Sequence, residues 1–201
     1  MWQGPPLQRT RDVFPQLEAL FFEDPWVYRT PPGQYGILFL LRRDINSCLG
    51  AEAGLHNRTP RQIQWPGAMG VFAGIDLLAK FLAGEDGDGM GNRFRCFVNR
   101  YFHLPAAEVE AIYQLRNSML HSFGLYSRLR DGTVYRFTLV SGGARPLVRH
   151  TLPEHYLVDV ISLHEDFEKA IGEYRRDLQG DVALQQNFLA MFPNYGAIHI
   201  G

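Results

Sequence analysis

The sequence predicts a mainly helical protein that carries a small β-sheet. Apolar residues recur at helical spacing over residues 34–124 and again after residue 160, whereas residues 125–140 alternate with a period of two. The 201 residues are 46% apolar and 20% charged, which is enough to bury a substantial core and excludes disorder as the main state.

Breaks in composition divide the chain into four parts. Residues 1–33 are rich in proline and are expected to form an arm over the core, with one short helix near residues 14–22. Residues 34–124 are expected to form a helical bundle, 125–160 a β-hairpin or small sheet, and 161–201 C-terminal helices that pack on the bundle.

Start and stop signals delimit the helices of the bundle. Pro66 and Pro105 suit first-turn positions, and Gly84 and Gly124 suit the position just after a helix end. Glycines inside the second helix are expected to permit close contact between helices: Gly67, Gly70 and Gly74. The expected helices span residues 35–49, 65–83, 91–103 and 106–123.

The loop at residues 84–89 is acidic and invites a calcium interpretation. An EF-hand needs an oxygen ligand where this chain has Met90, and the terminal glutamate of the motif is missing. We therefore expect a solvated turn and no metal site.

Alternating residues after Gly124 predict an antiparallel hairpin. Its strands are expected at residues 125–130 and 134–140, joined by an Asp131-Gly132 turn. Either residues 147–149 or residues 156–160 are expected to add a third strand and complete a small antiparallel sheet.

The chain then returns to helix. Ser162 and Glu165 are predicted to form a capping box at its start, and a final short helix is expected over residues 182–192. The longer helix has one apolar stripe, formed by Leu163, Phe167, Ala170, Ile171, Tyr174 and Leu178.

Charge and cysteine content restrict the function and the compartment. The net charge of −1 gives no global field for a polyanion, although residues 34–130 hold 11 basic and 8 acidic side chains. Cys48 and Cys96 lack metal-ligand spacing and suit a reducing interior. With no leader pattern and no apolar run of about 20 residues, we expect a cytoplasmic protein without membrane contact.

The fourth helix carries the side chains best suited to chemistry. The chain has no P-loop, nucleophile elbow or dinucleotide fingerprint. Arg116 and His121 are separated by four residues on this helix, whereas Arg145 with His150 and Arg149 with His155 fall in a Gly- and Pro-interrupted stretch that is expected to lack a rigid element.

A helical projection places Arg116 within an apolar arc and Asn117 and His121 on the other side. A buried guanidinium must be paired, and Asp76, within an apolar run of the second helix, is one candidate partner. His121 would then serve as a cation at the helix C-terminus. Alternatively, the helix is covered on two sides, by its own bundle and by a second subunit.

The string Leu115-Arg-Asn-Ser-Met-Leu-His-Ser122 resembles the R-(N/D/H)-x3-H helix of the HEPN superfamily. Residues 64–125, with Gly74-Ile-Asp-Leu-Leu-Ala-Lys-Phe81, Arg93-Phe94 and Tyr101-Phe102, also resemble a group of uncharacterised bacterial HEPN-like proteins. The resemblance implies a HEPN-like helical bundle that forms a homodimer; the hairpin and the C-terminal helices are additions to it.

The resemblance also implies a function: a metal-independent endoribonuclease whose site combines Arg116 and His121 of both subunits. Asn117 matches the polar position beside the arginine. RNA supplies its own nucleophile, the 2′-hydroxyl, so the protein needs only proton transfer and stabilisation of the phosphorane charge. No cofactor is expected, and the enzyme would cleave single-stranded RNA as a toxin or defence effector.

The alternative is a non-catalytic HEPN-like module that binds a nucleotide or a partner protein. Near-zero net charge favours it, because a ribonuclease usually benefits from a broad basic surface. An antitoxin or a nucleotidyltransferase is the expected partner in a paired system.

Overall fold

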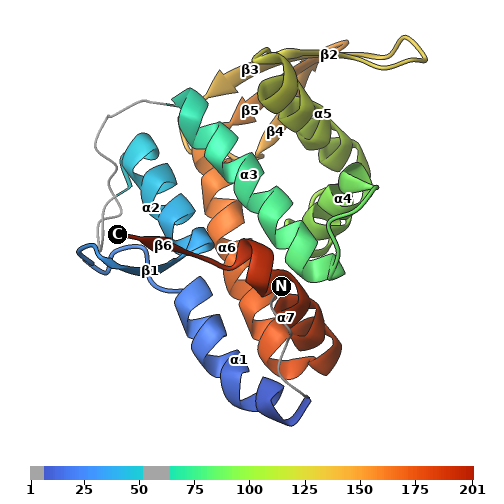
Figure 1. The fold of residues 1–201 in the computed structure, drawn as a ribbon. Helices are drawn as coiled ribbons and strands as arrows, with labels where there is room; N and C mark the ends of the chain where they lie inside the picture. The colour runs from blue at the N-terminus through green and yellow to red at the C-terminus, as the bar shows by residue number, and fades with distance from the viewer. Residues whose placement is uncertain (1–6, 52–63) are drawn as a thin grey trace.

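The computed structural model describes residues 7–51 and 64–201, which form seven helices and two small sheets (Figure 1). Helices make up 60% of the chain, so the mainly helical prediction is confirmed. The helices are α1 (Leu7–Phe21), α2 (Ile37–Leu49), α3 (Gln64–Ala83), α4 (Met90–Tyr101), α5 (Ala106–Ser122), α6 (Val160–Gly180) and α7 (Val182–Tyr195). The strands are β1 (Gly33–Gly36), β2 (Tyr126–Arg128), β3 (Val134–Val140), β4 (Val148–Leu152), β5 (His155–Asp159) and β6 (Ala197–Ile200).

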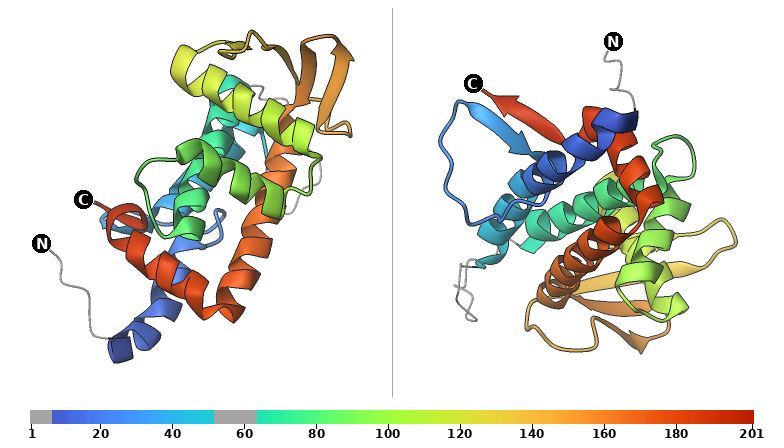
Figure 2. Two further views of the ribbon diagram at one scale, coloured as in Figure 1. Left: turned by 90° about the vertical axis from the view of Figure 1, so that its right-hand side faces the viewer. Right: turned by 90° about the horizontal axis from the view of Figure 1, so that it is seen from below.

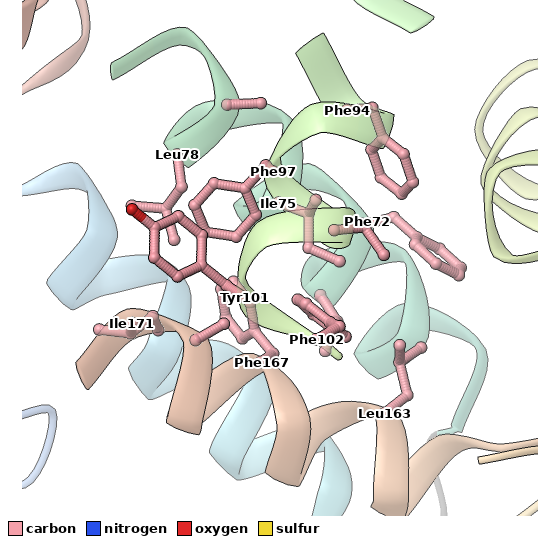
Figure 3. Close-up of a cluster of buried hydrophobic side chains, with 14 of the residues drawn as sticks. Phe72, Ile75, Leu78, Phe94, Phe97, Tyr101, Phe102, Leu163, Phe167 and Ile171 are labelled. Carbon is pink, nitrogen blue, oxygen red and sulfur yellow. The ribbon is translucent and has the colours of Figure 1, made fainter. Parts of the chain in front are cut away.

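Helix α3 occupies the centre of the core. It contacts α2, α4, α6 and α7, and its apolar side chains meet those of α4 and α6 in one cluster (Figure 3). Phe72, Phe97 and Phe167 are fully buried there. By length and composition α3 could cross a membrane, but most of it is buried inside this core, which accounts for its apolar sequence.

The glycines of α3 permit the close contacts that the sequence predicted. A Cβ at Gly67 would collide with Leu49, one at Gly70 with Ile45, and one at Gly74 with the ring of Phe167. The first two contacts join α3 to α2, and the third joins α3 to α6.

Replacing Gly74 by alanine is expected to lower the free energy of unfolding by about 1–3 kcal/mol, because the Phe167 ring must move within a packed core. Gly172→Ala on α6 is the matched control, since a Cβ there meets nothing within 4 Å. The control should be neutral or slightly stabilising because alanine is the better helix former. Urea unfolding measures both; equal midpoints for the two variants would contradict the packing argument.

The four-stranded sheet has the order β2-β3-β5-β4. The predicted β2–β3 hairpin is present and antiparallel, with Gly132 at φ 91° in its turn. The prediction that the whole sheet is antiparallel is wrong, however, because β3 and β5 are parallel. The chain after β3 crosses to the outer edge, forms β4 there, and returns as β5 between β3 and β4, so both candidate third strands are real.

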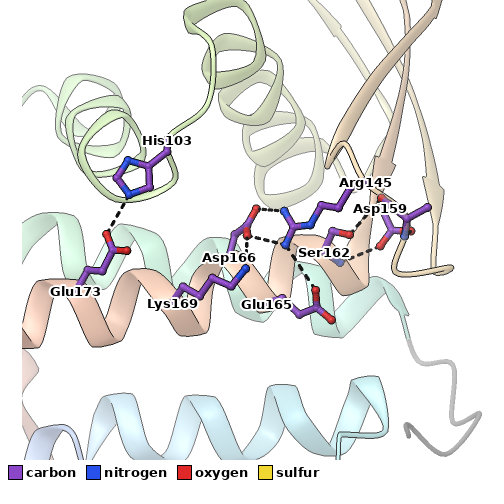
Figure 4. Close-up of polar contacts among 9 residues, drawn as sticks. His103, Arg145, Asp159, Ser162, Glu165, Asp166, Lys169 and Glu173 are labelled. Atoms are coloured by element: carbon purple, nitrogen blue, oxygen red, sulfur yellow. Dashed lines mark hydrogen bonds and ion pairs between the residues drawn. The ribbon is translucent and has the colours of Figure 1, made fainter. Parts of the chain in front are cut away.

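The stretch 142–155 is therefore more regular than its glycines and prolines suggest. Arg149 and His150 lie on β4, and His155 begins β5, so the expectation that these residues lack a rigid element is wrong. Arg145 forms an ion pair with Asp166 on α6, with Nη2 2.7 Å from Oδ1 (Figure 4). Strand pairing, which the local pattern did not reveal, supplies the rigidity.

A second, two-stranded sheet joins β1 to β6, from Gly33 opposite Ile200 to Gly36 opposite Ala197. Neither strand was predicted, because four residues are too few to show alternation and the partners are far apart in the chain. Figure 2 shows the four-stranded sheet at one end of the helices and α1 at the other. Helix α1 begins at Leu7, earlier than predicted.

Two helix boundaries differ from the predicted ones. Helix α6 begins at Val160, so its N-cap is Asp159, whose Oδ1 accepts from the Ser162 backbone N–H at 2.8 Å; the predicted capping box is wrong. Helix α5 ends at Ser122, and Phe123 rather than Gly124 adopts the left-handed conformation, at φ 47°. Both differences arise because a strand adjoins the helix almost directly. All six predicted stripe residues of α6 are buried.

Candidate functional site

Arg116 is buried on α5 and pairs with α3. Only 4% of the residue is exposed, and Asp76 Oδ2 accepts from its Nε at 2.9 Å and from its Nη2 at 2.5 Å. The sequence-based interpretation that pairs these two residues is confirmed. The guanidinium lies inside the apolar arc of α5, where an unpaired charge would be strongly unfavourable.

The remaining N–H groups of Arg116 also have acceptors. Nη1 donates to Asn117 Oδ1 at 2.9 Å and to His121 Nε2 at 2.8 Å, and Nη2 donates to Met90 Sδ at 2.7 Å. A guanidinium has five N–H donors. With the two bonds to Asp76, all five are engaged, so Arg116 acts in this state as the centre that positions its neighbours.

This arrangement brings the three predicted site residues together. Arg116 is a donor only, so His121 Nε2 must be the acceptor, and a neutral imidazole then carries its proton on Nδ1. The His121 side chain is exposed and Asn117 is half-buried. One buried cation thereby orients two polar groups at the protein surface.

Asp76 provides the counter-charge under unusual conditions. Burial raises the pKa of its carboxyl group, while the hydrogen bonds and charge of Arg116 act in the opposite direction. Its Oδ1 is buried and has no hydrogen-bond partner among the described residues. Both hydrogen bonds of the ion pair therefore end on the same carboxylate oxygen, Oδ2.

The outer face of α5 borders an open pocket of about 580 Å³. One wall comes from α5, with Asn117 and His121, and another comes from strand β2, with the exposed Tyr126 and Arg128. The full lining comprises Tyr113, Asn117, Ser118, His121, Ser122, Tyr126, Ser127 and Arg128. The lining is therefore mostly polar, and it combines residues of the helical bundle with residues of the hairpin.

The turn from α5 into β2 is fixed by Ser118. Its hydroxyl donates to the Gly124 carbonyl at 2.6 Å and accepts from the Tyr126 backbone N–H at 2.9 Å. These bonds set the separation of the two pocket walls. No role was predicted for Ser118.

A polar chain behind the pocket ties β2 to the helices. Ser127 Oγ donates to Gln114 at 2.7 Å, Gln114 donates to Glu110 at 2.7 Å, and Arg95 of α4 donates to Glu110 at 2.7 Å. Glu110 is partly desolvated, but the hydrogen bonds from Arg95 and Gln114 outweigh that cost and lower its pKa. The spacing of Glu110 and Gln114 by four residues was the one available sequence signal.

The acidic loop at residues 84–89 directly precedes Met90, the first residue of α4. Arg93 donates to the carbonyl oxygens of Gly87 and Asp88 at 2.9 Å each, so backbone carbonyls of this loop serve as acceptors for a buried arginine. Across residues 7–51 and 64–201, no group of three or more His, Cys, Asp or Glu side chains has an arrangement suited to a metal ion.

Comparison of this chain with protein-family models, with curated proteins and with solved structures found no match.

Proposed function

We propose that this protein is a metal-independent endoribonuclease of the HEPN type that cleaves single-stranded RNA. The observation that carries the proposal is the double hydrogen bond from Arg116 Nη1 to Asn117 and His121. It gathers the three motif residues at the wall of a pocket open to solvent.

The proposed reaction uses the 2′-hydroxyl of RNA as nucleophile. His121 Nε2 accepts the 2′-hydroxyl proton as the 2′-oxygen bonds to phosphorus, and the P–O5′ bond breaks with transfer of a proton to O5′. The products are a 2′,3′-cyclic phosphate and a 5′-hydroxyl. A homodimer supplies one neutral histidine as the base and the partner's copy, as the protonated imidazolium, as the acid that gives O5′ its proton.

Arg116 can take part by exchanging acceptors. The two acceptors of Nη1 are neutral, an amide oxygen and an imidazole nitrogen, whereas a phosphate oxygen is charged and forms the stronger hydrogen bond. Exchange at Nη1 releases His121 Nε2 for proton transfer and leaves the bonds to Asp76 intact. Substrate binding would thus activate the base.

Exposed apolar side chains beside the site support the dimer. Phe123 is 71% exposed and follows His121 by two residues, and Met90 is 44% exposed and accepts a hydrogen bond from Arg116. A second subunit that covers them would bring two copies of Arg116 and His121 together. Sedimentation of the wild-type protein and of Phe123→Asp tests this, with the variant expected to be monomeric.

The test of the function is cleavage of a labelled single-stranded RNA in excess EDTA. We expect cleavage with cyclic-phosphate ends, and a single 2′-deoxy substitution should block cleavage at that position alone. Cleavage that tolerates the 2′-deoxy sugar, or no cleavage of any RNA by a folded dimer, would contradict the proposal.

The second candidate function is a non-catalytic module that binds a nucleotide or a partner protein. The saturation of Arg116 by acceptors within one subunit favours it, because no guanidinium N–H is left for a phosphate until an internal bond breaks. A thermal-shift screen of nucleotides together with a pull-down tests it. If no nucleotide raises the melting temperature and no partner protein is captured, this second candidate loses its support.

A further inference from the structure

We propose that the β2–β3 hairpin, which lies outside the bundle, is the RNA-binding platform of the site. Tyr126 stacks on the base next to the phosphate at His121, and Arg128 binds the following phosphate. This inference rests on the proposed function and names the part of the chain that selects an unpaired strand.

Tyr126 has the exposure and surroundings of a stacking residue. It is 45% exposed, and it lines the same pocket as His121. Its cross-strand partner is Arg136, whose guanidinium lies 5.1 Å from the ring centroid. In the described part of the chain this contact with Arg136 is the ring interaction of Tyr126, and it leaves the other face of the ring for a base.

The hairpin also carries the local positive charge that the chain as a whole lacks. Residues 125–140 contain three arginines and one acid, Asp131. The Asp131 carboxylate accepts from the Thr133 backbone N–H and so closes the turn. Arg128 and Arg130 are exposed and form no ion pair within the described part of the chain.

The platform is held at a fixed place relative to the reacting groups. Strand β2 is only three residues long, but Ser118 binds its first backbone N–H and Gln114 binds Ser127. Alternation along the strand places Tyr126 and Arg128 on one face and Ser127 on the other, toward α5. Because β2 is an edge strand of the sheet, residues of both its faces line the pocket, and anchoring through Ser127 leaves the other two side chains exposed at that edge.

These features favour single-stranded RNA over a duplex. Stacking on a tyrosine requires a base that is splayed out of its helix, and the faces of the bases in an A-form duplex are already stacked on one another. The spacing of Tyr126 and Arg128 by two residues, about 7 Å along a strand, is close to the separation of successive phosphates in an extended chain.

The experiment measures binding of a fluorescent, fully 2′-O-methylated oligonucleotide, which lacks the nucleophile and cannot be cleaved. Tyr126→Ala should weaken binding roughly tenfold, and Tyr126→Phe should restore it, because the ring is retained. Arg128→Gln should reduce the slope of log K against log salt by about 0.7, the value for one lost phosphate contact on a single strand.

Arg176→Gln is the matched control. Arg176 is an exposed arginine on α6 without an ion-pair partner among the described residues, and its loss should leave affinity and salt slope unchanged. Circular dichroism confirms that each variant folds, which we expect because the altered side chains are exposed.

The outcomes separate this inference from the proposed function. If His121→Ala abolishes cleavage while Tyr126→Ala and Arg128→Gln bind like wild type, the platform is overturned and the ribonuclease stands. If the wild type binds through Tyr126 and Arg128 but cleaves no RNA, the platform stands and the ribonuclease fails. Equal losses in Arg128→Gln and Arg176→Gln would also overturn the platform, since any surface charge would then suffice.

Discussion

Replacing His121 by alanine is expected to reduce RNA cleavage by a factor of about 10² to 10⁴, the range that general acid–base groups contribute. The side chain is exposed and its Nε2 borders the pocket, so the loss falls on proton transfer rather than on packing. Single-turnover cleavage in EDTA measures the effect. Stability should fall by about 1 kcal/mol, the typical net contribution of one hydrogen bond, because the variant removes the acceptor of one Arg116 N–H.

His103→Ala is the control for this variant. His103 is also exposed, its Nε2 lies 3.1 Å from Glu173 (Figure 4), and it does not line the pocket of His121. It should cleave like wild type. Equal activity of His121→Ala and His103→Ala would exclude His121 from the chemistry and favour the binding module.

Replacing Asp76 by alanine is expected to lower the free energy of unfolding by about 3–5 kcal/mol. The variant leaves the Arg116 guanidinium buried without its counter-charge, because the three other acceptors of that side chain are neutral. Urea unfolding measures the loss. The double variant Asp76→Ala with Arg116→Met should recover part of it, since no unpaired charge then remains.

Asp44→Ala tests whether burial is the cause. Asp44 forms an ion pair with Arg43, but both side chains are more than half exposed, so its loss should cost about 1 kcal/mol or less. If Asp76→Ala lowers the free energy of unfolding no more than Asp44→Ala does, water must hydrate the Arg116 guanidinium in the variant. The argument from burial would then fail.

Local sequence signals were sufficient wherever an element depends on its own residues. Helices α3 and α5 end close to the predicted residues, and Gly74 allows the contact expected of it. The burial of Arg116 and its pairing with Asp76 followed from the apolar arc around each residue. Periodicity and the cost of an unpaired charge are properties of short segments, so they can be read without a structure.

Features that depend on distant partners were not predicted. The parallel pairing of β3 with β5 and the sheet formed by β1 and β6 join segments whose own patterns say nothing of each other. The same is true of the site. Arg116, Asn117 and His121 share one helix and were identified together, whereas Tyr126 and Arg128 enter the pocket only because Ser118 turns the chain back along α5.

Asp159 ends β5 and caps α6, and its buried carboxylate joins three segments of the chain. Oδ1 accepts from the Ser162 backbone N–H, and Oδ2 accepts from the backbone N–H groups of Gly142 and Ala144. The sheet and α6 are therefore joined directly, with no flexible residues between them. Thermal motion should carry the strands and α6 together as one rigid unit, and amide hydrogens of residues 142–144 and of the first turn of α6 should exchange with solvent in a single opening event.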